Sequence, residues 1–63
     1  MAGEERFAVL KKILEDAGWM LVRISSSHHI FEKPGHSLLS IPVHRGKVKP
    51  AYVRQIRKLI EKD

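Results

Sequence analysis

Residues 19–43, WMLVRISSSHHIFEKPGHSLLSIPV, decide the fold of this chain. They contain three runs rich in strand-forming residues, Trp19–Ser25, His28–Lys33 and Ser37–Val43. A run of serines separates the first two, and a Pro-Gly pair separates the second from the third; both are typical of turns. Because short turns join successive antiparallel strands, this stretch predicts a three-stranded antiparallel meander.

Side chains are expected to alternate between two faces along each run. In the second run, alternation places Phe31 on the face opposite to His28 and Ile30. In the third run, Leu39 and Ile41 share one face. The sheet is therefore predicted to have one apolar face that is covered and one face that stays open to solvent.

Amphipathic helices are predicted on both sides of this stretch. The spacing of apolar residues indicates a first helix over Glu4–Ala17, with two glutamates in its first turn, where the helix dipole favours negative charge. Gly18 is expected to end this helix by taking a left-handed conformation. Pro50 suits the first position of a closing helix that runs to about Glu61.

The predicted order is thus α-β-β-β-α. The two helices have to bury their apolar stripes, and one face of the sheet is the surface available to them. We therefore predict a single α+β domain over residues 1–63, with a three-stranded antiparallel sheet and two helices on one face.

Composition narrows the function. The chain has no cysteine, which excludes disulfides and thiolate metal sites and favours a reducing compartment such as the cytoplasm. No secretion signal is recognisable, and no apolar run approaches the roughly 20 residues that cross a bilayer, so we expect no membrane association. The net charge of +5 and a pI near 10 favour polyanionic partners, above all nucleic acid or an acidic protein.

Four histidines stand out, because imidazole can transfer protons near neutral pH. His28 begins the second strand on its open face, whereas His29 is expected to face the helices and His36 to lie solvated beside a turn. His44 opens a basic loop, His44–Lys49, and could supply a second proton-transfer group or a phosphate contact. Their spacings do not match a zinc site, so we expect neither metal nor cofactor.

Short motifs follow one another in a definite order between about Phe7 and Ile60. They are Gly18-Trp19 after the first helix, Ser26-Ser27-His28-His29-Ile30-Phe31, Ile41-Pro42-Val43-His44, Gly46-Lys47-Val48-Lys49-Pro50 and Val53-Arg54-Gln55-Ile56. Together they resemble the HicA family of toxins, including its Gly-Ser-His-x-apolar-aromatic motif. That family shares the fold of double-stranded RNA-binding domains, which has the same α-β-β-β-α order.

The resemblance implies the toxin of a type II toxin–antitoxin system. Such a protein is a metal-independent endoribonuclease that cleaves mRNA, and His28 corresponds to the catalytic histidine. The resemblance also implies a HicB-type antitoxin as partner, which covers the active site. One position departs from the family's pattern: Ser26 stands where the family usually has Gly, a residue that would permit a positive φ.

RNA contacts are expected from basic and polar side chains along the strands and the basic loop. The candidates are Arg23, Ser26, Ser27, Lys33, His44, Arg45, Lys47 and Lys49. Two alternatives to the enzyme remain. The first is a non-catalytic RNA-binding module of the same fold, which Ser26 in place of Gly favours, and the second is an adaptor that binds an acidic protein.

Overall fold

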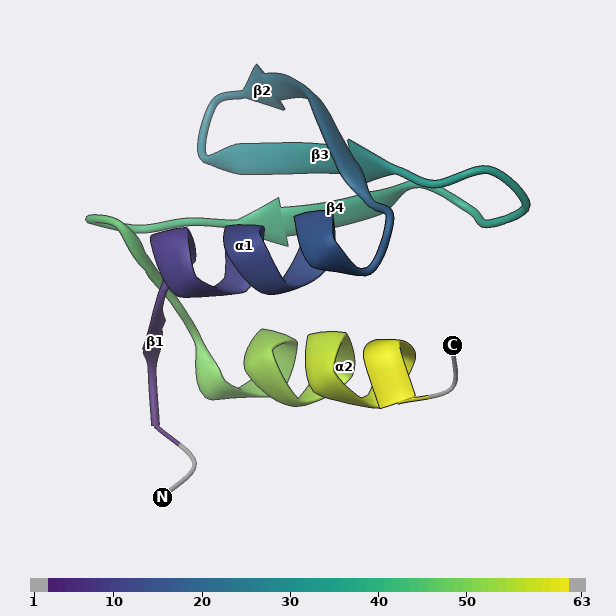
Figure 1. The fold of residues 1–63 in the computed structure, drawn as a ribbon. Helices are drawn as coiled ribbons and strands as arrows, with labels where there is room; N and C mark the ends of the chain where they lie inside the picture. Colours follow the sequence, from purple (N-terminus) through teal and green to yellow (C-terminus); the bar gives the residue numbers. More distant parts are fainter. Residues whose placement is uncertain (1–2, 62–63) are drawn as a thin grey trace.

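The computed structural model describes residues 3–61 and contains two helices and five strands (Figure 1). In chain order these are β1 (Glu5–Arg6), α1 (Phe7–Asp16), β2 (Met20–Ser25), β3 (His28–Glu32), β4 (Leu39–Pro42), β5 (Lys47–Val48) and α2 (Pro50–Glu61). Strands β2, β3 and β4 form one antiparallel sheet in that order, and β1 pairs with β5 in a separate two-stranded ladder. The predicted α+β fold, with its central meander, is confirmed.

The register of the three-stranded sheet follows from its two turns. Ser25 pairs with His28 across the first turn, and His28 pairs in turn with Pro42 on β4. Pro42 is the last residue of an edge strand, where the sheet tolerates its missing N–H. The pairing of β2 shifts at Val22, and such a bulge bends and twists the strand that carries it.

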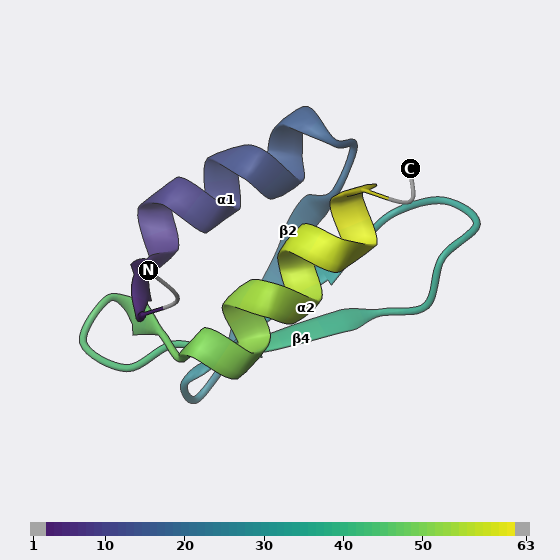
Figure 2. The ribbon, with the colours of Figure 1, turned by 90° about the horizontal axis from the view of Figure 1, so that it is seen from below.

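Both helices cover the same face of the sheet, as predicted, and Figures 1 and 2 show them side by side beneath it. The alternation along β3 is confirmed, because Phe31 is fully buried while His28 is exposed. Each helix, the sheet and β5 contribute to one apolar core, whose buried members are Leu10, Leu14, Trp19, Phe31, Leu39, Ile41, Val48, Val53 and Ile56. Within residues 3–61, neither helix is long and apolar enough to cross a membrane.

The start of the first helix differs from the prediction. Glu4 and Glu5 do not form its first turn, because α1 begins only at Phe7. Glu5 and Arg6 instead form β1, and the backbone N–H of Phe7 donates to the carbonyl of Gly46 at 2.8 Å. Pairing with a distant segment therefore overrides the local helical preference of these residues.

The end of the first helix matches the prediction. Gly18 has a φ of 97°, and its N–H donates to the Glu15 carbonyl at 3.0 Å. The N–H of Trp19 donates to the Leu14 carbonyl at 2.9 Å, which completes a Schellman motif. A Cβ at position 18 would lie 3.3 Å from Cε of the flexible Lys33 side chain, so the positive φ, more than space, is what favours glycine here.

Candidate functional site

His28 lies where β3 begins, at the end of the sheet where the chain turns from β2 to β3. Its side chain is exposed, on the face of the sheet that the helices leave open. Its neighbours across the strands are Ser25 and Pro42, neither of which is charged. The imidazole is therefore accessible from solvent, with no charged side chain directly opposite it on either neighbouring strand.

Two of the other histidines are placed away from His28. His29 is half-buried on the helical side of the sheet, where its ring centroid lies 4.3 Å from that of Phe7 and its Nδ1 lies 3.3 Å from the Ser27 carbonyl oxygen. His36 lies in the loop between β3 and β4, and its ring centroid is 5.4 Å from that of Trp19. Both positions agree with the sequence analysis.

His44 lies at the same end of the sheet as His28. The N–H of Val43 donates to the Ser27 carbonyl at 2.7 Å, so pairing between the two strands continues one residue past Pro42. His44 is thereby two residues beyond the partner of His28, a diagonal position that separates side chains by roughly 7–8 Å in a regular antiparallel pair. The histidine is exposed, so the fold brings two accessible imidazoles to one end of the sheet.

The predicted basic loop, His44–Lys49, is more ordered than a loop. His44 and Lys47 exchange two backbone hydrogen bonds of 2.9 Å each, which makes a hairpin with Arg45 and Gly46 at its tip. Both tip residues have positive φ, 53° and 76°, as a type I′ turn demands. The prediction of a loop is therefore wrong for these residues, and the hairpin holds the Arg45 side chain at an exposed tip.

Ser26 and Arg45 are the non-glycine residues with positive φ between residues 3 and 61. Both lie at the His28 end of the sheet. A left-handed conformation costs a residue with a Cβ roughly 1–2 kcal/mol. Ser26, at 55°, adopts a left-handed conformation that glycine takes more easily, so the serine occupies this turn at a cost in free energy.

Most candidate RNA contacts cluster around this end. Arg45, Lys47 and Lys49 are exposed on the hairpin and just after it, and Ser26 is exposed in the neighbouring turn. Ser27 is half-buried there. Arg23 is exposed on β2, paired with Ile30 on the open face of the sheet.

Lys33 does not belong to this cluster. It lies five residues along the chain from His28, roughly 16 Å away at about 3.3 Å per strand residue. Its side chain lies over Gly18, at the opposite end of the sheet. A ligand centred on His28 would have to extend roughly 16 Å to contact Lys33. The predicted RNA-contact residues therefore lie at two separate places on the sheet.

Arg6 joins the cluster, although the sequence analysis did not include it. It is exposed on β1 and lies directly opposite Lys47 on β5. Like charges that face each other across a strand pair repel, and an anion bound between them would relieve that repulsion. No local sequence signal could have revealed Arg6, because its place depends on pairing with a segment about forty residues later.

The fold and this site define a class of protein, the small basic α+β domains that present histidines and cations at one end of an antiparallel meander. Such a surface is suited to binding a polyanion. Comparison with protein families identifies the member of that class. The family model described as the HicA toxin of bacterial toxin–antitoxin systems matches residues 8–61. The match covers most of the chain, which therefore belongs to the HicA toxin family, as its motifs indicated. None of the curated proteins searched matches the chain.

Proposed function

We propose that this toxin is a metal-independent endoribonuclease that cleaves mRNA, with His28 as its catalytic residue. The observation that carries the proposal is the exposed imidazole of His28 beside a cationic hairpin, in a chain of the HicA family. His28 is also the histidine that the family's motif singles out.

RNA supplies its own nucleophile for this reaction. A base takes the proton from a 2′-hydroxyl, and the 2′-oxygen attacks the adjacent phosphorus. The bond from phosphorus to the 5′-oxygen then breaks, and an acid protonates that oxygen, leaving a 2′,3′-cyclic phosphate and a 5′-hydroxyl. Imidazole is suited to either proton transfer, and one such group typically contributes about 10²–10⁴-fold to the rate.

His44 provides the second group at the scissile phosphate in this proposal. Its diagonal position relative to His28 suits a phosphate held between the two rings, where it either completes proton transfer or donates a hydrogen bond to a phosphate oxygen. His29 and His36 take no part, because one is packed on Phe7 and the other lies near Trp19.

The cations around the histidines bind the RNA backbone. Arg45 and Lys47 belong to the hairpin, Arg6 and Lys49 lie beside it, and Arg23 extends the surface along β2. Such contacts supply most of the affinity for nucleic acid, and salt weakens them. The substrate and the absence of cysteine are both consistent with action in the cytoplasm.

The partner in this proposal is a HicB-type antitoxin that covers the His28 end. A toxin of net charge +5 attracts an acidic partner, and complementary charge speeds association. Covering the exposed histidine and the hairpin would block the same surface that RNA needs. Toxicity would then depend on release from that partner.

The test is cleavage of a labelled single-stranded mRNA in EDTA. The wild-type protein should cut it, His28→Ala should not, and His36→Ala should cut it normally, because that histidine lies at the other end of the sheet. A parallel binding measurement should show that His28→Ala still holds RNA. Cleavage by His28→Ala at the same rate as by His36→Ala would sink the assignment of His28.

The alternative function is RNA binding without cleavage. Its support is Ser26 in place of Gly, although Ser26 keeps the positive φ of the turn. RNA binding by wild type with no cleavage would establish it. Weak RNA affinity even at low salt would instead indicate an adaptor for an acidic protein.

A further inference from the structure

His29 occupies a position in the sheet that suits an apolar residue. It lies on the helical face of β3, half-buried, and its partners across the strands are Ile24 on β2 and Ile41 on β4. Its ring centroid lies 4.3 Å from that of Phe7, the first residue of α1. Burial of a polar group costs free energy unless the group finds a hydrogen-bond partner. Packing alone therefore does not account for an imidazole at this position.

The hydrogen-bond partner of the His29 ring is a backbone oxygen. Its Nδ1 lies 3.3 Å from the carbonyl oxygen of Ser27. Because a carbonyl can only accept, Nδ1 carries the proton in this contact, and the neutral ring is then protonated at Nδ1 and not at Nε2. The same oxygen accepts from the N–H of Val43 at 2.7 Å, so both of its lone pairs are in use.

The Ser27 carbonyl belongs to the peptide unit that leads into His28. A peptide unit is planar, so two donors that hold its oxygen also fix the orientation of the His28 N–H and Cα. The residue before this unit is Ser26, whose φ of 55° is a strained conformation that surrounding contacts have to maintain. The hydrogen bond from His29 is one of those contacts.

Both donors to the Ser27 carbonyl are connected to the hairpin. Val43 directly precedes His44, where the hairpin begins. His29 packs on Phe7, whose N–H donates to the Gly46 carbonyl at the hairpin tip. The turn that carries His28 is therefore held at a fixed place relative to the cations of the hairpin, although the ring of His29 itself faces the helices.

We propose that His29 is a positioning residue for RNA cleavage, which acts through the Ser27 carbonyl to hold His28 in its reactive orientation. The inference rests on the proposed function of His28 and adds a residue that makes no contact with the phosphate. Catalysis depends on such orientation, because a small misplacement of a reacting group lowers the rate steeply. Loss of this one hydrogen bond should lower the rate of cleavage about tenfold.

Leucine and asparagine at position 29 make a matched pair of variants. Their side chains have nearly the same shape, but only asparagine has an N–H to donate. His29→Asn should keep a kcat close to that of the wild type on single-stranded mRNA in EDTA, since its Nδ2 takes the place of the ring Nδ1. His29→Leu should lower kcat about tenfold and leave KM nearly unchanged, because the surface that binds RNA is intact.

The stability of the two variants should follow the opposite order. His29→Leu should unfold at the same urea concentration as His29→Asn or at a higher one, because it places an apolar side chain beside Ile24 and Ile41. If His29 served only the stability of the fold, the more stable variant would also be the more active one. The two measurements together therefore separate positioning from packing.

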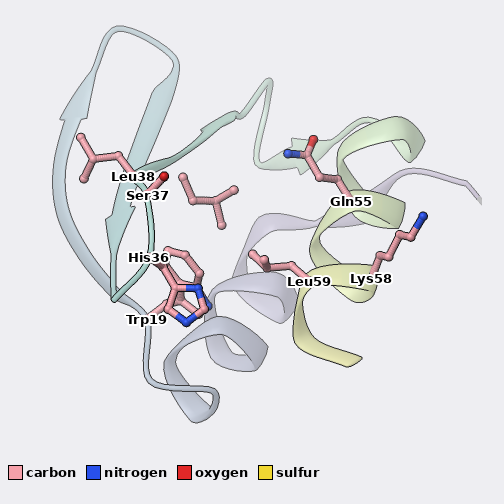
Figure 3. A pocket seen from close by; sticks show the side chains of 8 residues that line it. Trp19, His36, Ser37, Leu38, Gln55, Lys58 and Leu59 are labelled. Carbon is pink, nitrogen blue, oxygen red and sulfur yellow. The ribbon is translucent and has the colours of Figure 1, made fainter. Parts of the chain in front are cut away.

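His36 supplies the control for removing an imidazole. Figure 3 shows its ring beside Trp19, in the hollow between the β3–β4 loop and α2 at the other end of the sheet. His36→Leu and His36→Asn should therefore both cleave at the wild-type rate. A tenfold loss in His36→Leu would mean that the effect of leucine is not specific to position 29.

NMR spectroscopy tests the contact without RNA. A long-range proton–nitrogen spectrum of the wild type should show the neutral His29 ring protonated at Nδ1, and the His28 amide signal should broaden in His29→Leu but not in His29→Asn. Protonation at Nε2, or equal kcat for the two variants, overturns the proposal. Absence of cleavage by the wild type would refute the ribonuclease function instead, and the two NMR signals would then decide whether His29 holds the turn.

Discussion

The two ends of the sheet both depend on left-handed backbone, but they obtain it from different residues. At the Trp19 end, Gly18 and Gly35 have φ values of 97° and 82°, and glycine takes such angles without strain. At the His28 end, Ser26 and Arg45 have φ values of 55° and 53° although each carries a side chain. Both of these side chains are exposed.

The difference indicates that at the His28 end the side chains of Ser26 and Arg45 are kept in spite of the backbone strain that they cause. A left-handed residue with a Cβ costs about 1–2 kcal/mol, so two of them are a notable expense for a domain this small. Strained backbone tends to concentrate at functional sites, and here it lies beside His28. The turns at the Trp19 end instead have glycine at their left-handed positions, where no side chain is present.

The largest effect should come from replacing His28, at the end of the sheet where the backbone is strained. His28→Ala is expected to lower the rate of RNA cleavage by about 10²–10⁴-fold, because one proton transfer loses its catalyst. Single-turnover cleavage in EDTA measures this directly. Leu38→Asp, at the other end, is the matched surface change and should cleave at the wild-type rate; a comparable loss there would erase the functional difference between the ends.

A smaller loss should follow from placing a side chain at the glycine end. Gly18→Ala forces a Cβ into a left-handed position and brings it within 3.3 Å of the Lys33 side chain. We expect the free energy of unfolding to fall by about 1–2 kcal/mol, measured by urea denaturation. Gly3→Ala is the control, since a Cβ there would meet nothing within 4 Å. Equal stability of both variants would show that this turn tolerates a side chain.

Removing charge from the hairpin should weaken RNA binding, by a free energy similar to the loss of stability expected for Gly18→Ala. Arg45→Ala is expected to lower affinity for a single-stranded RNA severalfold. The slope of log affinity against log salt should become shallower by about 0.7, the value for one lost phosphate contact. Fluorescence anisotropy at several salt concentrations measures both quantities. Lys12→Ala, which removes a charge from α1, should change neither, and an unchanged slope for Arg45→Ala would remove that side chain from the interface.

The smallest effect should be a gain in stability at the His28 end. Ser26→Gly relieves the left-handed strain but increases the freedom of the unfolded chain, so we expect a net stabilisation of about 0.5 kcal/mol. Urea denaturation measures the gain. Cleavage assays on the same variant show what the serine side chain contributes: a slower variant would mean that the hydroxyl contacts RNA. Loss of stability would contradict the strain that its φ of 55° implies.

Several features could be predicted because their causes are local. The three strands follow from residue type and alternation, which place Phe31 in the core and His28 in solvent. Gly18 and Pro50 mark the end of one helix and the start of the other, since each has a conformation that suits its position. The motif around His28 likewise pointed to the HicA family from sequence alone.

The sequence by itself therefore determined the order of the elements, the faces of the strands and the histidine to examine. Only the tertiary structure decided that Glu5 and Arg6 leave the helix to pair with β5, and that Arg6 joins the cations opposite Lys47. It likewise separated Lys33 from His28 and turned a basic loop into a hairpin. The physical reason is that periodicity and turn chemistry act over a few residues, whereas pairing between distant segments depends on the assembled fold.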